Sequence, residues 1–295
     1  MEQANAIELK NITKRFGEVV ANDSVDLSVK HGEILSVLGE NGSGKTTLMN
    51  MISGIYFPDE GQIFVDGEEG SICSPKDSFA LGIGMIHQHF KLVDVLTAAE
   101  NIILGLEGKS VLDMKKVVQD IQEVTERYGF ELDPNQKIYD MSVSQKQTVE
   151  IVKMLYRGAN ILILDEPTAV LTPQETEKLF TVLRNMRDQG KSIIIITHKL
   201  NEVLALSDRV SVLRKGKYIG TVETKNATAE SLTEMMVGEK IDLNIERPDP
   251  VNPVKRLVIE NLSCVNKEGV KTLKNASMEA YGGEILGIAG IAGSG

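Results

Sequence analysis

The sequence predicts an α/β fold in which a mostly parallel sheet is sandwiched by helices and carries an inserted helical subdomain. Short, nearly continuous apolar runs rich in β-branched residues indicate strands that are buried on both faces; they read "EILSVL", "NILILD", "SIIIIT" and "RVSVLR". Segments with helical spacing lie between these runs, and "ETEKLFTVLRNMRDQG" ends on a glycine suited to a helix C-cap. Strands that alternate with helices are typical of an α/β layered domain.

The composition is that of a folded protein with an acidic balance of charge. Its 295 residues suggest one large domain or about two ordinary ones, and 42% of them are hydrophobic. The net charge of -10 argues against nucleic acid as a general partner, because phosphate backbones require a surplus of Lys and Arg. No apolar run approaches the roughly 18 residues of a membrane span, and "MEQANAIELK" lacks the pattern of a secretion signal. Cys73 and Cys264 have no metal-type spacing, so we expect two reduced cysteines in a cytoplasmic protein.

The predicted first domain covers residues 1–240. Within it, residues of about 97–158 have helical spacing and little strand signal, as in "VLDMKKVVQDIQEVTERYG" and "VEIVKMLYRG". We interpret this stretch as a helical subdomain inserted between two strands of the sheet. Three prolines among Asp and Asn residues then predict an extended linker over residues 241–255.

Residues 256–295 repeat the opening of the first domain. "GGEILGIAGIAGSG" at residues 282–295 matches "HGEILSVLGENGSG" at residues 31–44 with a constant offset of 251, and "RLVIENLSCV" resembles "AIELKNITKR". We therefore interpret these residues as the truncated start of a second copy of the domain. On this interpretation the chain is a fragment of a protein of roughly 500 residues, two copies of the repeat.

A phosphate-binding loop is predicted by "GENGSGKT", which fits G-x-x-x-x-G-K-[ST], follows a strand and precedes a helix. Its glycines let backbone N–H groups turn toward phosphate oxygens, and the helix N-terminus adds the positive end of its dipole. The lysine would reach the β- and γ-phosphates, and the first threonine would bind Mg²⁺. The residues expected to contact the nucleotide are Gly39, Glu40, Asn41, Gly42, Ser43, Gly44, Lys45, Thr46 and Thr47.

Three further residues at strand ends complete the predicted catalytic site. Asp165 follows four apolar residues in "ILILDEPT", a Walker-B arrangement that would supply a second ligand for Mg²⁺. Glu166 beside it is the expected general base for a water that attacks the γ-phosphate. His198 follows the strand "SIIIIT", and parallel-sheet proteins bind ligands at such carboxyl ends.

The order of these motifs resembles the nucleotide-binding domain of ABC transporters over residues of about 5 to 240. This resemblance implies ATP and Mg²⁺ as cofactors and gives roles to further residues. Gln88, in "MIHQHF", resembles the Q-loop glutamine, which contacts Mg²⁺ and the attacking water and senses the membrane partner. Phe16, in "KRFGEVV", stands where this family places an aromatic residue that stacks on adenine, although a core role is the alternative.

"MSVSQ", at residues 141–145, occupies the position of the family's signature motif, Leu-Ser-Gly-Gly-Gln. In this family the signature of one domain meets the ATP bound by a second, so Ser142, Ser144 and Gln145 are expected to contact that nucleotide. Val143 and Ser144 replace both glycines, and a side chain at 144 crowds the close approach that glycine permits. The activity of the site served by this signature is therefore open. Thr172 also replaces the aspartate that many relatives carry in the D-loop.

With these departures and the repeated domain, the chain resembles the tandem ATPases of bacterial uptake systems for simple sugars and nucleosides. "HQHFKLVDVLTAAENI" favours the nucleoside branch over relatives that serve ribose or galactose. The resemblance implies an ATP-hydrolysing motor on the cytoplasmic face of the membrane. Its partners would be the second ATPase domain, membrane permease subunits and an extracytoplasmic solute-binding protein. Two alternatives are a soluble ribosome-associated tandem ATPase and a nucleotide switch that does not hydrolyse.

Overall fold

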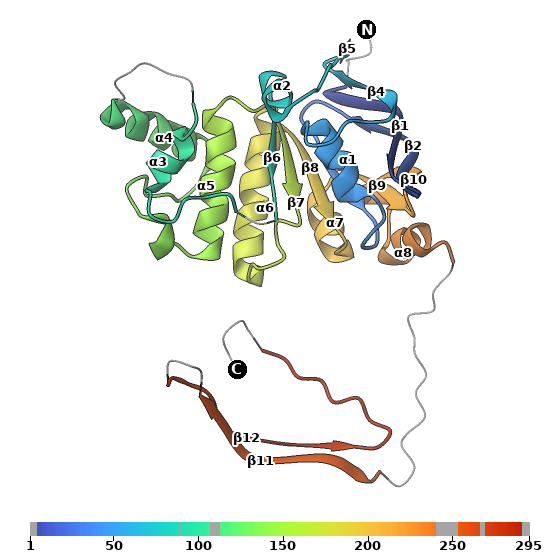
Figure 1. Ribbon diagram of the computed structural model, residues 1–295, viewed down its shortest axis with the longest axis vertical. Helices are drawn as coiled ribbons and strands as arrows, with labels where there is room; N and C mark the ends of the chain where they lie inside the picture. The colour runs from blue at the N-terminus through green and yellow to red at the C-terminus, as the bar shows by residue number, and fades with distance from the viewer. Residues whose placement is uncertain (1–4, 89, 107–112, 240–252, 266–268, 291–295) are drawn as a thin grey trace. The chain divides into compact units, whose positions relative to one another are not determined.

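The computed structural model describes residues 5–88, 90–106, 113–239, 253–265 and 269–290. The chain divides into two compact units, Met1–Ile241 and Asp242–Gly295 (Figure 1). Within the described ranges, no helix is both long and apolar enough to cross a lipid bilayer.

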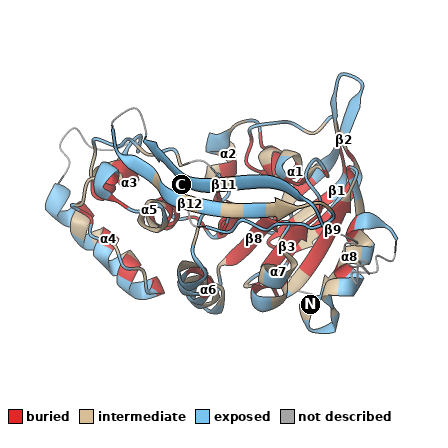
Figure 2. Ribbon diagram, turned by 90° about the horizontal axis from the view of Figure 1, so that it is seen from below, coloured by how far each residue is buried: buried red, intermediate tan, exposed pale blue. Residues whose placement is uncertain are grey.

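A six-stranded sheet forms the centre of the first unit, with strand order β10-β9-β3-β8-β7-β6. All neighbours from β9 to β6 run parallel, and β10 joins β9 as an antiparallel hairpin. Its strands are β3 (Ile34–Leu38), β6 (Ile83–Ile86), β7 (Ile161–Asp165), β8 (Ser192–Thr197), β9 (Arg209–Arg214) and β10 (Lys217–Glu223). The strands β3 and β8 are buried throughout (Figure 2). The predicted fold class is therefore confirmed.

Side chains of this sheet alternate between two cores, which is why the strand sequences are apolar at nearly every position. Ile161 and Ile163 face a core that includes helix α1 (Lys45–Ile52), while Leu162 and Leu164 face the opposite core. The opposite core is covered by α5 (Val143–Tyr156) and α6 (Pro173–Asp188). The short helices α2 (Pro75–Ala80), α7 (Leu200–Leu206) and α8 (Ala229–Val237) also belong to this unit.

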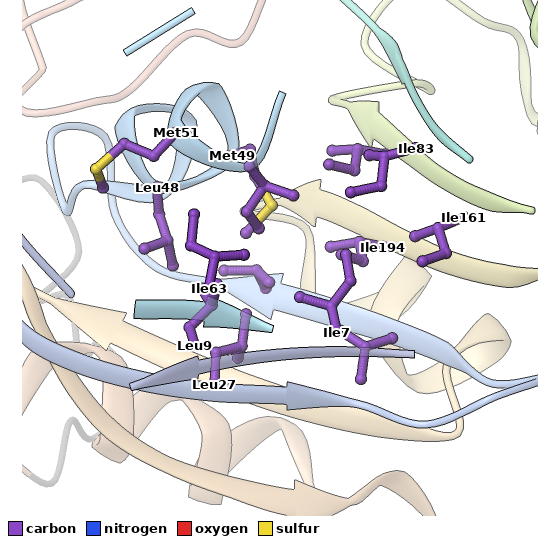
Figure 3. Close-up of a cluster of buried hydrophobic side chains, with 14 of the residues drawn as sticks. Ile7, Leu9, Leu27, Leu48, Met49, Met51, Ile63, Ile83, Ile161 and Ile194 are labelled. Atoms are coloured by element: carbon purple, nitrogen blue, oxygen red, sulfur yellow. The ribbon is translucent and has the colours of Figure 1, made fainter. Parts of the chain in front are cut away.

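A second, antiparallel sheet packs over α1 and was not predicted from the sequence. Its order is β2-β1-β4-β5, and its strands are β1 (Ile7–Phe16), β2 (Val19–Val29), β4 (Glu60–Val65) and β5 (Glu68–Glu69). Side chains from both sheets and from α1 meet in one core: Leu9 and Leu27 come from the antiparallel sheet, Leu48 and Met49 from α1, and Ile194 from the parallel sheet (Figure 3). The phosphate-loop helix is therefore held between the two sheets.

The helices α3 (Ala98–Ile103), α4 (Met114–Tyr128) and α5 lie together beside the parallel sheet, on the side away from the antiparallel sheet (Figure 1). They enclose a core of their own that includes Ala98, Ile102, Ile121, Val149 and Val152. A single 3₁₀ turn, Ile138–Asp140, precedes α5. Because α5 contributes to this core and to the sheet core, it joins the helical region to the sheet.

The second unit contains one antiparallel hairpin, formed by β11 (Lys255–Val265) and β12 (Lys271–Tyr281). Most of its residues are exposed or half-buried, in contrast to the strands of the parallel sheet (Figure 2). Residues 284–290 follow without strand structure. Residues 241–252 of the predicted linker and residues 291–295 at the end of the repeat lie outside the described residues.

Candidate nucleotide-binding site

The phosphate loop occupies the turn between β3, which ends at Leu38, and α1, which begins at Lys45. Gly44 precedes the helix with a left-handed φ of 95°, and a Cβ there would lie 2.4 Å from the Ala21 carbonyl oxygen. At Gly39 a Cβ would lie 2.3 Å from the Leu213 carbonyl oxygen. Glycine is required at both positions because neighbouring backbone fills the space that a side chain would need.

We expect Gly44→Ala to lower the free energy of unfolding of the first unit by about 2–5 kcal/mol. The left-handed φ costs about 1–2 kcal/mol for a residue with a Cβ, and overpacking against Ala21 adds about 1–3 kcal/mol. Urea denaturation measures the difference. Gly42→Ala is the matched control, because Gly42 has a φ of 81° and nothing within 4 Å of its added Cβ. Equal losses in the two variants would contradict the packing argument.

The interior of the loop contains polar groups that suit a polyphosphate. Lys45 is only 5% exposed, and its Nζ donates to the carbonyl oxygens of Gly39 (2.7 Å) and Glu40 (2.8 Å). Burial lowers the pKa of Lys45, while the nearby carboxylates of Glu166 and Asp165 act in the opposite direction. The buried Ser43 hydroxyl has no hydrogen-bond partner in the described part of the chain. An anion placed in the loop would satisfy this hydroxyl and the ammonium group together.

The residues at the start of α1 and the end of β7 fit a magnesium ion. Thr46 Oγ1 donates to Asp165 Oδ2 across 3.5 Å, which places a hydroxyl and a carboxylate oxygen side by side. Burial raises the pKa of the Asp165 carboxyl, and Glu166 adds to this effect. A divalent cation would offset the same unfavourable burial of charge. Hydroxyl and carboxylate oxygens are ligands that Mg²⁺ prefers.

Glu166 and His198 form a direct pair next to Asp165. The Nδ1 atom of His198 lies 2.8 Å from Glu166 Oε1, and the Glu166 backbone N–H donates to the Ile196 carbonyl oxygen. Glu166 has a φ of 47°, a left-handed conformation that is strained for a residue with a side chain. The hydrogen bond to Ile196 holds this backbone conformation against the C-terminal end of β8, whose last residue is Thr197. The two residues that the sequence placed at separate strand ends are therefore in contact.

Four polar residues, which the sequence motifs did not indicate, link the chain after Glu166 to the chain after His198 and to α5. Lys199 Nζ donates to the Thr168 carbonyl oxygen at 3.0 Å and pairs with Glu202 at the same distance. Glu202 also accepts a hydrogen bond from the Thr168 hydroxyl. Gln147, on α5, donates to the Pro167 carbonyl oxygen at 2.8 Å. No sequence motif singles these residues out, although each of the first three lies within four residues of Glu166 or His198.

Gln88 lies two residues beyond β6, which pairs in parallel with β7 at Ile86 and Leu164. This register puts Gln88 at the same edge of the sheet as Asp165. The Gln88 side chain is exposed and makes no hydrogen bond to another described residue. The structure thus places Gln88 at the same edge of the sheet as Asp165, without a hydrogen bond to Thr46 or Asp165.

Two predicted signature residues form the N-terminal cap of α5. Ser142 Oγ accepts from the Gln145 N–H at 3.2 Å, and Gln145 Oε1 accepts from the Ser142 N–H at 2.9 Å. This reciprocal capping box fixes the start of the helix and leaves Ser144 half-buried in its first turn. Neither Ser142 nor Gln145 is hydrogen-bonded to a described residue of the phosphate loop. Thr172, the other departure, caps α6 in the same way with Glu175.

Phe16 is the last residue of β1, and the residue is 44% exposed. Tyr56, which lies beyond the C-terminal end of α1, meets this ring edge to face with a centroid distance of 5.2 Å. An exposed ring at a strand end is available for stacking, so the core role that was the alternative for Phe16 is not favoured. Tyr56 is a further aromatic residue that the sequence reasoning did not identify.

The site has a glycine loop at a helix N-terminus, a threonine–aspartate pair and a glutamate–histidine pair, all at the carboxyl ends of parallel strands. This combination defines the class of P-loop nucleotide-binding proteins. A sequence profile described as "ABC transporter" matches residues 22–169. The chain belongs to the ABC transporter family, whose ATPase domains bind ATP, and the resemblance inferred from the motifs is confirmed.

Named relatives match nearly the whole chain. It is 48% identical to "Nucleoside import ATP-binding protein NupA" of Lactococcus lactis subsp. cremoris (strain MG1363), over 100% of this chain and 59% of that protein. It is 47% identical to "Guanosine import ATP-binding protein NupO" of Bacillus subtilis (strain 168), over 98% of this chain and 57% of that protein. "Ribose import ATP-binding protein RbsA 1" of Streptomyces avermitilis is 42% identical over 98% of this chain and 55% of its own length. The chain therefore spans less than two thirds of the length of these relatives.

Solved structures show the same fold. The ADP conformation of MJ1267, an ATP-binding cassette of an ABC transporter, matches with a TM-score of 0.71 and 26% identity, over 80% of this chain and 99% of that one. The dimeric post-hydrolysis state of the cassette MJ0796, bound to ADP and Pi, matches with a TM-score of 0.64 and 28% identity. That match covers 74% of this chain and 98% of the MJ0796 chain.

Proposed function

We propose that this chain is the ATP-hydrolysing motor of an ABC importer for nucleosides. The observation that carries the hydrolytic part is the 2.8 Å contact between Glu166 and His198, next to the Thr46–Asp165 pair. A protein that only switched on binding nucleotide would have no need of a base held in strained backbone beside a histidine. The contact therefore favours hydrolysis over the non-hydrolysing switch.

The mechanism follows from the groups that line the site. The triphosphate lies against the backbone N–H groups of Gly39–Thr47, and Lys45 exchanges its two carbonyl acceptors for the β- and γ-phosphate oxygens. Thr46, Asp165 and Gln88 would hold Mg²⁺, which supplies charge neutralisation on the phosphate oxygens. Glu166 accepts the proton of the attacking water, and His198 and Gln88 orient that water toward the γ-phosphate.

The same geometry supports the partner surfaces that we propose. Ser142, Ser144 and Gln145 lie at the start of α5, where a second ATPase domain of the same protein would present its nucleotide to them. The relatives named above are longer than this chain, and β11 and β12 form an antiparallel hairpin like that of β1 and β2, which supports such a second domain. Gln88 and the helical region would contact membrane permease subunits. We further propose that the motor lies peripherally on the cytoplasmic face of the membrane. An extracytoplasmic solute-binding protein would deliver the solute to the permease.

The substrate class rests on the relatives. The two at 47–48% identity are named for nucleoside and guanosine import, whereas the ribose importers are 40–42% identical. This order favours nucleosides and keeps simple sugars such as ribose as the second candidate. Import proteins among the relatives also favour a membrane motor over a ribosome-associated ATPase.

Transport by the assembled complex tests this proposal. We expect the full-length protein to sediment with membranes that contain its permease, and vesicles of those membranes to take up labelled guanosine only with ATP on the motor side. Uptake of ribose in place of guanosine would change the substrate class. Sedimentation with ribosomes, and no uptake of either solute, would overturn the importer assignment.

A further inference from the structure

The segment between α1 and β4 is hydrogen-bonded to the end of β1, directly before Phe16. The Asp59 N–H donates to the Thr13 carbonyl oxygen at 2.8 Å, and the Asp59 carboxylate accepts from Lys14 Nζ at 2.9 Å and from the Arg15 N–H at 2.6 Å. Glu60 pairs with Arg15 at 2.7 Å. These contacts fix the backbone that carries the Phe16 ring.

Tyr56, in the same segment, meets the ring directly. The centroids of Phe16 and Tyr56 are 5.2 Å apart and their planes are inclined by 73°, an edge-to-face geometry that aromatic pairs prefer. The Tyr56 backbone N–H donates to the Asn50 carbonyl oxygen, which holds the Tyr56 backbone at the C-terminal end of α1. Lys14, held by Asp59, places its Nζ 5.5 Å from the Phe16 centroid. Among the described residues this is the single aromatic ring pair.

An exposed ring at a strand end would otherwise rotate about its side-chain bonds. A base that stacks on it would then have to order the ring when it binds, and that ordering lowers the affinity. The contact with Tyr56 sets the plane of Phe16 in advance. It leaves Phe16 44% exposed, so part of the ring remains free for a base.

We propose that Tyr56 is a positioning residue for nucleotide binding, which holds the Phe16 ring in the plane against which the adenine stacks. The proposal rests on the role of Phe16 in the proposed function. Because Tyr56 acts through Phe16, it contributes to affinity for the base and leaves the phosphate loop unaffected. Stacking uses the π-face that every base has, so the contribution is equal for adenine and guanine.

Binding to this chain separates base affinity from phosphate affinity. Titration calorimetry with ATP, GTP and inorganic tripolyphosphate, each with Mg²⁺, should show that Tyr56→Ala weakens ATP and GTP binding about three- to tenfold. Tripolyphosphate binding should be unchanged, which also shows that the variant is folded. Tyr56→Phe keeps the ring and should bind ATP within about twofold of the unmodified chain. Phe57→Ala is the matched control, because Phe57 is adjacent, 50% exposed and outside the ring pair.

The outcomes distinguish this inference from the function on which it rests. Equal effects of Tyr56→Ala and Phe57→Ala on ATP, or a parallel loss of tripolyphosphate binding, would overturn the positioning role. The binding of ATP and tripolyphosphate is also measured for Phe16→Ala. If it also leaves the preference for ATP over tripolyphosphate intact, the base-stacking role of Phe16 is itself wrong. If Phe16→Ala removes that preference and Tyr56→Ala does not, only the inference about Tyr56 is overturned.

Discussion

Glu166→Gln should lose nearly all ATP turnover and leave ATP binding intact. The amide has nearly the shape of the carboxylate and can still face His198, yet it cannot accept the proton of the attacking water. Loss of a positioned general base lowers the rate about 10²- to 10⁴-fold. Phosphate release at saturating ATP measures the rate, and calorimetry measures the affinity.

The matched control for this variant is Glu126→Gln, which makes the same chemical change at an exposed position on α4. It should keep the full rate of phosphate release. If Glu166→Gln instead released phosphate at the unmodified rate, the base would have to be another group, and the contact between Glu166 and His198 would be structural.

Lys45→Ala should remove most of the ATP affinity without weakening the fold. The cost of burying its ammonium offsets the hydrogen bonds that it donates to the Gly39 and Glu40 carbonyl oxygens, whereas a bound triphosphate would pair with it at short range. A hydrogen bond to a charged group contributes about 1.5–3 kcal/mol, so we expect about a ten- to hundredfold loss of affinity. Thermal unfolding with and without ATP reports both quantities, because a ligand raises Tm only by binding the folded state.

Lys225→Ala provides the comparison, since its side chain is 75% exposed and lies far in sequence from the phosphate loop. Its Tm should rise with ATP as in the unmodified chain. A normal ATP-induced rise for Lys45→Ala would contradict the assignment of the loop. A lower Tm for Lys45→Ala without ATP would show that the buried ammonium also stabilises the fold.

Much of the catalytic site could be predicted from the sequence because its signals are local. Lys45 and Thr46 belong to an eight-residue pattern between a strand and a helix, and Asp165 and Glu166 end an apolar run. Each residue is placed by the element that directly precedes it. Parallel strands end at one edge of a sheet, so separate local predictions converge on one site.

Contacts between distant segments could not be predicted in this way. The antiparallel sheet pairs β1 with β4, more than 40 residues later, and the intervening phosphate loop gives no sign of that pairing. Tyr56 meets Phe16 through the same pairing of distant segments. Gln147 reaches the Pro167 carbonyl oxygen because α5 packs on the sheet, and the helical pattern of α5 alone gives no indication of it.

The repeated "GEIL" shows where local sequence ceases to decide. In the first copy, Ile34 and Leu35 are fully buried in β3, which pairs with β8 and β9 more than 150 residues later. In the second copy, Ile285 and Leu286 are 78% and 44% exposed and form no strand. The described residues of that unit contain no counterparts of β8 and β9. Sequence alone was enough to identify the nucleotide-binding motifs and the fold class. Whether a given apolar run becomes a buried strand was decided only in the tertiary structure, because the hydrogen bonds of a parallel strand come from distant parts of the chain.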